Sequence, residues 1–431
     1  MNAIFLFIVL ISFAFAGLRQ FVWDQAAAQV SPMQELTKAM LESAAGSVDL
    51  AIGLVGIMAL FLGLMKVAEK GGMLKIIAML IRPLMIRLFP QIPPEHPAMG
   101  AMILNMSANA MGLGNAATPF GIRAMQELDK LNPTPGTATD SMALFLAINT
   151  SSVTLLPTGV IALRAAAGSN DPAGILPTTL FATLCSTAVA IFATKFYARI
   201  LSRRRGEVST YKRDKVSFYS KGDKNDGVEA DEAYPIWVSI LALGMLTCLI
   251  PVAIVFGEQL SPWIIPGLMA GFLVFGILKK VAVYETFVEG AKEGFQVAIK
   301  IIPYLVAILV AVGMLRASGA MGYMIDSIGG FTRHMGIPAE ALPMAFLRPL
   351  SGSGAYGLLA SIINDPSIGP DSYVGYLVST LQGSTETTFY VLAVYYGSIQ
   401  VKRIRHTLAA GITGDVAGVM GAVAACLFLY G

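Results

Sequence analysis

Two polar stretches with the same layout stand at the edges of apolar segments, and they hold the side chains best suited to chemistry. The first reads NTSSVTLLP, residues 149–157, and the second reads QGSTETTFYVLAV, residues 382–394. The second sets a carboxylate, Glu386, among hydroxyls and an amide. Polar groups at membrane depth are costly, so they usually face a cavity, a partner or a solute path. The repeated layout predicts a duplicated membrane protein built around a polar centre, and it favours transport over catalysis.

Composition supports a protein that crosses a membrane many times. The chain has 431 residues, of which 55% are hydrophobic and 13% charged, and its mean hydropathy is +0.67. A soluble domain needs about a quarter charged residues to cover its surface. We therefore expect a multi-pass protein of the cytoplasmic (inner) membrane, with the lipid bilayer as its partner. The net charge of +3 gives no reason to expect nucleic-acid binding.

No enzyme is expected, because the chain lacks an HExxH pair, a nucleophile elbow and a phosphate-binding loop. The cysteines Cys185, Cys248 and Cys426 stand inside apolar runs without metal-ligand spacing, so they are interpreted as packing residues. Neither a metal nor a cofactor is predicted. A coupling ion, proton or sodium, is left open, as is homo-oligomerisation.

Several apolar runs fall short of the roughly 20 residues that span a bilayer, or are broken by Gly and Pro. Met99–Leu113 and Leu342–Ile363 are the clearest cases. Irregular backbone is tolerated at membrane depth only where it lines a cavity or is buried in protein. These runs therefore predict discontinuous or re-entrant helices. The first run, Ala3–Gly17, resembles a signal peptide but lacks a basic start, which favours an uncleaved anchor helix.

The chain divides into two similar halves. The segment Glu35–Lys66 matches Glu285–Arg316, and the two polar stretches match each other. We expect a first repeat over residues 1–201, a cytoplasmic linker plus one extra transmembrane helix over 202–260, and a second repeat over 261–431. Basic residues mark cytoplasmic loops, and a single added helix inverts the second repeat. The predicted fold class is an all-α polytopic membrane protein with two inverted-topology repeats and broken or re-entrant helices.

The polar side chains of both halves form the candidate binding site. Glu386 in an apolar helix costs several kcal/mol unless it is neutralised, paired or wet. It could bind a cation, carry a coupling proton or hydrogen-bond a solute, and the alternative is a carboxylate that only packs helices. Arg348 pairs either with Glu386 or with an anionic ligand group. Asp415 is a second intramembrane acid with a weaker case. The predicted substrate-contacting residues are Asn105, Asn109, Asn115, Asn149, Ser151, Ser152, Thr154, Arg348, Ser351, Ser353, Gln382, Ser384, Thr385, Glu386 and Thr387.

These motifs carry a family resemblance. The Asn105–Thr118 stretch and NTSSVTLLPTGVIALR, residues 149–164, resemble spore maturation protein A. RPLSGSGAYG, residues 348–357, and GSTETTFYVLAVYYG, residues 383–397, resemble spore maturation protein B. Both belong to the nucleoside-recognition Gate family, which is similar to parts of concentrative nucleoside transporters and of ferrous-iron transporters. The resemblance implies a membrane translocation fold whose path these segments line.

The predicted function is a secondary transporter, or facilitator, of a small polar solute such as a nucleoside-like molecule. The solute would pass through a central site between the two repeats. One alternative is a non-transporting membrane assembly or regulatory protein of the spore maturation type. The other is a cation conduit resembling the membrane part of the ferrous-iron transporter.

Overall fold

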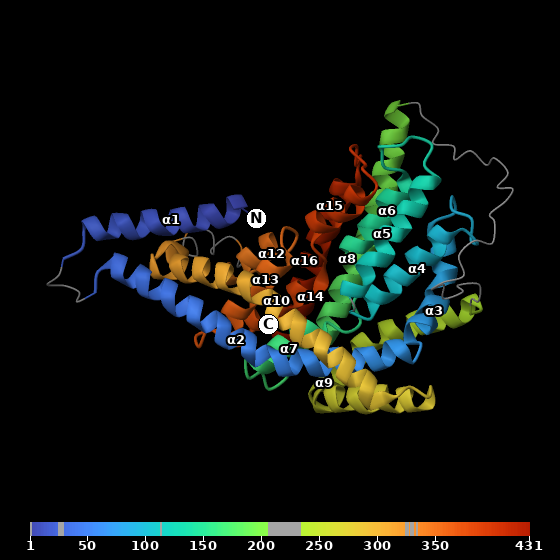
Figure 1. The fold of residues 1–431 in the computed structure, drawn as a ribbon. Coiled ribbons are helices and arrows are strands. Elements are labelled where there is room, and N and C mark those ends of the chain that lie inside the picture. The colour runs from blue at the N-terminus through green and yellow to red at the C-terminus, as the bar shows by residue number, and fades with distance from the viewer. Residues whose placement is uncertain are drawn as a thin grey trace.

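The structure, a computed structural model, is helical throughout the residues that it describes apart from loops and one isolated bridge (Figure 1). Those residues are 2–24, 30–112, 114–205, 234–323, 327, 332 and 335–431. In chain order the helices are α1 (Asn2–Phe21), α2 (Pro32–Lys70), α3 (Met73–Leu88), α4 (Pro97–Ala110), α5 (Gly114–Lys130), α6 (Asp140–Thr150), α7 (Thr158–Ala166), α8 (Ile175–Arg205), α9 (Ile236–Leu278), α10 (Val283–Ala317), η1 (Ala339–Ala341), α12 (Leu342–Leu347), α13 (Gly352–Ile363), α14 (Tyr373–Ser384), α15 (Thr388–Ser398) and α16 (Thr407–Tyr430).

The same order of elements occurs twice. A long helix, an interrupted pair, a second interrupted pair and a long apolar helix follow each other as α2, α4/α5, α6/α7 and α8. They follow again as α10, α12/α13, α14/α15 and α16. The corresponding long helices pack on each other, α2 along α10 and α8 along α16. In addition, α6 and α14 each contact both α8 and α16. This exchange of equivalent contacts is what two similar halves around a common centre produce.

Close backbone approach and ion pairs hold α2 against α10. A Cβ added to Gly290 would come 2.5 Å from the Leu62 carbonyl oxygen, so only glycine fits there. Small residues allow helices to approach in this way within a membrane. Where α2 contacts α10, Lys66 Nζ also lies 2.9 Å from Glu293 Oε1, and Lys70 Nζ lies 2.5 Å from Glu289 Oε2. The pairing of α2 with α10 is therefore specified by both shape and charge.

Both apolar runs that the sequence predicts to be discontinuous are interrupted. Within Met99–Leu113, α4 ends at Ala110 and Gly112 adopts a φ of +77°, which favours glycine. Within Leu342–Ile363, α12 and α13 are separated around Pro349, which has no backbone N–H to donate to the preceding turn of a helix. These interruptions confirm the prediction of broken helices.

Two further breaks divide runs that look continuous in hydropathy. α6 ends at Thr150 and α7 begins at Thr158, while α14 ends at Ser384 and α15 begins at Thr388. We call residues 151–157 the first gap and residues 385–387 the second gap. Both gaps fall on the polar stretches. Conversely, α9 is one helix from Ile236 to Leu278, and residue 260, where the predicted linker with its extra helix ends, lies inside it.

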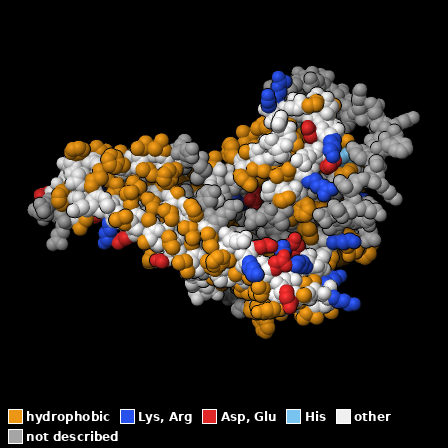
Figure 2. Space-filling model, in the orientation of Figure 1, with side chains coloured by type: hydrophobic (Ala, Val, Ile, Leu, Met, Phe, Trp, Pro, Cys, Tyr) orange, Lys and Arg blue, Asp and Glu red, His pale blue; other side chains and the backbone are white. Residues whose placement is uncertain are grey.

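Within the described part of the chain, two helices are long and apolar enough to cross a membrane by length and composition. They are Ile175–Ile200 and Thr407–Tyr430. Figure 2 shows hydrophobic side chains spread over the arm that contains α1 and α2. In α1, Phe7 is 62% exposed and Phe21 is 91% exposed. An apolar face of this extent needs an apolar environment or partner.

Candidate functional site

The two gaps meet among buried residues. The backbone N–H of Glu386, in the second gap, donates to the Thr150 carbonyl oxygen at the edge of the first gap, at 2.8 Å. An interrupted helix leaves backbone groups without intrahelical partners. Here a group from one half satisfies a group from the other. We call this place the crossing.

Each gap is also tied to the interrupted pair that precedes it. The Leu155 N–H of the first gap donates to the carbonyl oxygen of Ala110 at the end of α4, at 2.9 Å. After the second gap, the Phe389 N–H donates to the Pro349 carbonyl oxygen between α12 and α13, at 3.1 Å. The same kind of backbone bond therefore recurs in both halves, and irregular backbone faces irregular backbone at the crossing.

Arg348 holds the second gap together. Its Nε donates to the Gln382 carbonyl oxygen at 3.0 Å and its Nη1 donates to Thr387 Oγ1 at 3.0 Å, while Nη2 donates to the Thr385 carbonyl oxygen. Nη2 also lies 3.5 Å from Glu386 Oε2. Of the two partners left open for Arg348, the structure contains Glu386. The guanidinium side chain is 7% exposed and the carboxylate side chain 44%, so Glu386 keeps capacity for a further contact.

The asparagines of α4 connect neighbouring elements. Asn109 Nδ2 donates to Asn149 Oδ1 of α6 at 3.0 Å, and Asn105 Nδ2 donates to Tyr395 Oη of α15 at 3.2 Å. Asn105 also donates to the Ala117 carbonyl oxygen at 2.8 Å. The Asn105–Tyr395 bond joins the two halves, whereas the other two bonds connect elements within the first half. The side chain of Asn115 lies outside what the structure describes.

Four of the predicted hydroxyls bond to local backbone, those of Ser151, Thr154, Ser351 and Ser384. Ser151 Oγ donates to the Ala147 carbonyl oxygen at 2.8 Å, and Ser384 Oγ donates to that of Leu381 at 3.0 Å. Ser351 Oγ caps α13 by accepting from the Gly354 N–H at 3.0 Å. Serine and threonine commonly make such bonds inside membrane helices and at their ends. Thr154 Oγ1 makes a longer bond, 3.4 Å, to the Ser152 carbonyl oxygen.

The predicted residues thus fall into groups. The crossing brings together Asn149, Ser151, Ser152, Gln382, Ser384, Thr385, Glu386 and Thr387, with Arg348 behind the second gap. Asn105 and Asn109 flank it through α15 and α6. Thr154 stands in the first gap, whereas Ser351 and Ser353 stand at the start of α13, where Ser351 serves as a cap. Their contact with a solute stays a prediction.

The helices α8 and α16 lie beside the crossing and add polar residues that are not among the predicted substrate-contacting residues. Thr187 Oγ1 of α8 donates to the Ser151 carbonyl oxygen of the first gap. Asp415 of α16 accepts from Thr388 Oγ1, the first residue of α15, at 2.7 Å. A Cβ on Gly418 would meet Thr385 Cγ2 at 2.7 Å, so glycine lets α16 lie against the second gap. The signal in the sequence was the acid in GITGDVAG, residues 411–418, set among glycines in an apolar run.

Two ion pairs tie the broken helices together at their far ends. Arg164, near the end of α7, lies 3.0 Å from Asp371, which directly precedes α14. Arg405, which follows α15, lies 2.7 Å from Asp140 at the start of α6. The end of each broken helix is therefore paired with the beginning of the other, and the two broken helices run in opposite directions.

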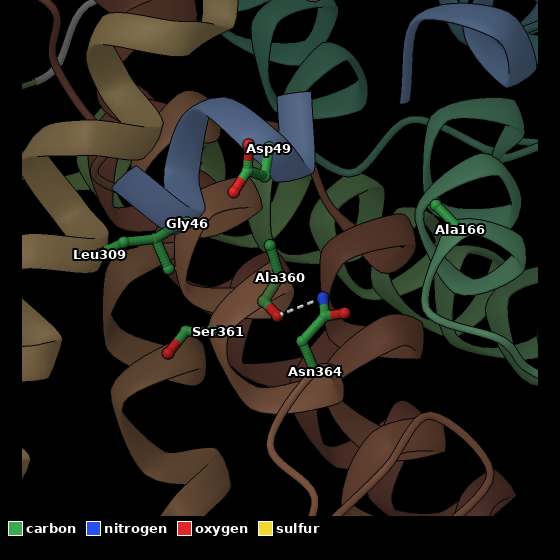
Figure 3. A pocket seen from close by; sticks show the side chains of 7 residues that line it. All are labelled: Gly46, Asp49, Ala166, Leu309, Ala360, Ser361 and Asn364. Atoms are coloured by element: carbon green, nitrogen blue, oxygen red, sulfur yellow. Dashed lines mark hydrogen bonds between the residues drawn. The ribbon is translucent and has the colours of Figure 1, made fainter. Parts of the chain in front are cut away.

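A cavity of about 340 Å³ lies elsewhere, between α2, α7, α10 and α13 (Figure 3). Asp49, Ser361 and Asn364 are its polar lining residues, and the Asn364 side chain is held by the Ala360 carbonyl oxygen at 2.8 Å. None of the predicted site residues lines it. Among the described residues no group of three or more His, Cys, Asp or Glu side chains gathers where it could hold a metal ion.

Comparison with known proteins assigns the family. The Gate model, described as nucleoside recognition, matches residues 51–167 and again residues 298–402. The chain belongs to this family and contains two Gate regions. The first runs from within α2 through α7, and the second from within α10 to just beyond α15, so each region holds one gap.

The halves are similar to two curated proteins of Bacillus subtilis (strain 168). Spore maturation protein B is 44% identical over 172 residues, which is 40% of this chain and 96% of that protein. Spore maturation protein A is 44% identical over 165 residues, which is 38% of this chain and 84% of that protein. The two similarities cover separate parts of the chain, as the motifs predict.

Two solved structures also align along most of the chain. The YdaH transporter of Alcanivorax borkumensis aligns with a TM-score of 0.42 and 13% identity, covering 98% of this chain and 97% of that one. CNTnw in an intermediate state aligns with a TM-score of 0.37 and 14% identity, covering 98% and 90%.

Proposed function

We propose that the protein is a multi-pass cytoplasmic-membrane transporter, or facilitator, for a small polar solute that binds at the crossing. The single observation that carries this proposal is the bond from the Glu386 N–H to the Thr150 carbonyl oxygen. It joins two helix interruptions from different halves beside buried hydroxyl, amide and carboxylate groups. Broken helices that meet at the centre of two repeats are the usual site plan of secondary transporters.

Inverted topology is part of this proposal. The Arg164–Asp371 and Arg405–Asp140 pairs support it, because they require the two broken helices to run antiparallel. Alternating access would then consist of one of these two ion pairs opening while the other ion pair stays closed. The family description, nucleoside recognition, supports a nucleoside-like solute as the first class to test. Amide and hydroxyl groups at the crossing can both donate to and accept from such a molecule.

A non-transporting membrane assembly is the second candidate. It is supported by the named relatives and by the hydroxyls of Ser151 and Ser384, which bond to local backbone. A packed centre of this kind would hold the halves together without admitting a solute.

Ligand-induced thermal stabilisation in detergent separates the two, since a ligand that binds only the folded state raises its melting temperature. The panel should contain nucleosides, peptidoglycan fragments, dicarboxylates and divalent metals. Any ligand that stabilises is then tested for counterflow in proteoliposomes, with Ser152→Val as the site variant and Thr413→Val, where α16 contacts Tyr197 of α8, as the matched control. Solute-specific stabilisation and counterflow, both weakened by Ser152→Val alone, support the transporter. Stabilisation by none of the panel together with no counterflow supports the assembly.

A further inference from the structure

Asp415 lies against the crossing, in a setting unlike that of Glu386. It is 4% exposed and sits on α16 between Gly411 and Gly418. A Cβ on Gly411 would meet Thr388 Cγ2 at 3.0 Å, and one on Gly418 would meet Thr385 Cγ2 at 2.7 Å. The glycines thus place the Asp415 segment of the helix directly beside the second gap.

The Asp415 carboxyl group has one hydrogen-bond donor. Thr388 Oγ1 donates to Oδ2 at 2.7 Å, while Oδ1 is buried and has no hydrogen-bond partner among the described residues. A charged carboxylate loses its hydration on burial and needs several donors or a cation in exchange. One hydroxyl is too little. The neutral acid, by contrast, loses far less on burial and needs only its hydroxyl satisfied.

Glu386 has what Asp415 lacks. Its carboxylate is half exposed and stands 3.5 Å from the Arg348 guanidinium, so its charge is both hydrated and paired. The two acids of the crossing therefore differ in the form that each favours. Asp415, which has neither hydration nor, among the described residues, a paired cation, suits the protonated form.

The other groups that face α16 near Asp415 are neutral or engaged. Within the described residues, α6, α8 and the second gap bring the uncharged side chains of Thr150, Ser186 and Thr385 there, and no bond from them to the Asp415 carboxyl group is found. Arg348 is the charged group whose field reaches Asp415. Other titratable groups also touch α16, Tyr197 at Thr413, Tyr396 at Thr407 and Cys185 at Gly421.

We infer that Asp415 is the proton-binding group of the crossing, a role that rests on the proposed transport function and gives it its coupling ion. The carboxyl group binds a proton when the second gap is packed against α16. It releases that proton when the gap moves and water or Arg348 can stabilise the charge. One carboxylate and one hydroxyl are too few oxygen ligands for a metal cation, which favours the proton over sodium.

Infrared difference spectra of the full-length protein test this directly, because a protonated carboxyl group has its own C=O stretch. Spectra are compared between about pH 5 and about pH 9 for the wild type, Asp415→Asn and Glu386→Gln. We expect a buried carboxylic-acid band that Asp415→Asn removes and Glu386→Gln keeps. A band that persists in Asp415→Asn, or that sodium abolishes at constant pH, overturns the inference.

Thr388→Val supplies a second test if Asp415→Asn folds poorly. Valine keeps the shape but removes the donor that favours the charged carboxylate, so the midpoint of the band should move up by about one pH unit. An unmoved midpoint contradicts the assignment. The spectra need no solute, so the two proposals can fail separately. Counterflow together with a carboxylic-acid band that Asp415→Asn does not remove rejects the proton site alone. A band that Asp415→Asn removes, without counterflow, rejects the transport function alone.

Discussion

At the scale of single residues, Arg348 is the side chain on which the second gap depends. Its guanidinium binds two carbonyl oxygens and one hydroxyl that the interruption of α14 and α15 leaves available, and it neutralises Glu386. A lysine ammonium keeps the charge but cannot reach all of these acceptors in the planar geometry of a guanidinium.

We therefore expect Arg348→Lys to lower the free energy of unfolding by about 2–4 kcal/mol, the loss of one or two charge-assisted hydrogen bonds. Thermal unfolding in detergent measures it, with exposed Arg87→Lys as the matched control. Equal melting temperatures for Arg348→Lys and the control would show that the gap is held by packing instead.

At the scale of elements, α4 begins with an unusual cap. His96 Nδ1 accepts from the Ala98 N–H at 3.1 Å, which requires the ring nitrogen to be unprotonated. Burial lowers the pKa of His96 below its ordinary value, and Glu127 only partly opposes this effect. The folded state thus binds the proton less readily than the unfolded chain does.

The sign of the pH dependence follows. Above about pH 6.5 both states have a neutral His96, and the cap contributes in full. As the pH falls below that value the unfolded chain binds a proton first, so stability decreases until the folded pKa is passed. We expect His96→Asn, which can cap without titrating, to remove this part of the decrease. Melting temperatures of the two proteins measured between about pH 7 and about pH 5 check it, and parallel curves would contradict it.

The ion pairs Arg164–Asp371 and Arg405–Asp140, which we call the end pairs, differ in burial. Their loss should therefore lower the stability of the protein by different amounts. The Arg164 side chain is fully buried, whereas that of Arg405 is 17% exposed. Removing the partner of a fully buried charge is more destabilising than removing that of a charge that water still reaches in part. We expect Asp371→Asn to cost about 3 kcal/mol and Asp140→Asn about 1 kcal/mol. Chemical or thermal unfolding of the two variants side by side measures the difference, and the reverse order would refute this account.

At the scale of the whole molecule, the antiparallel broken helices make a topological prediction. Asn170 lies beside the Arg164–Asp371 pair, and Lys402 lies near the Arg405–Asp140 pair. We expect Asn170→Cys and Lys402→Cys to be labelled by a membrane-impermeant thiol reagent from opposite sides. The background should replace Cys185, Cys248 and Cys426 by alanine. Labelling of both from one side would exclude an inverted repeat.

The local parts of this architecture could be predicted from the sequence, while the distant contacts could not. Glycine, proline and clustered hydroxyls mark helix interruptions within a short window, so both polar stretches and the broken runs were identified. The Arg348–Glu386 contact was one of two stated alternatives. Arg164 with Asp371 and Arg405 with Asp140 are each separated by more than two hundred residues. No local pattern in the sequence links the residues of these pairs. The role of Asp415 likewise depends on the second gap, which packs against it.

The bond between the Glu386 N–H and the Thr150 carbonyl oxygen has a consequence for assembly. Together with the two end pairs it places the main polar contacts between two segments of one polypeptide, each similar to a separate relative. The two segments should therefore associate even when no peptide bond joins them. Residues 1–205 and 234–431, produced as two polypeptides, should each be degraded or aggregate alone and copurify as a one-to-one complex when coexpressed. Glu386→Pro, which lacks the bonding N–H, should weaken that complex, so the fused chain behaves as a heterodimer whose subunits happen to share a backbone.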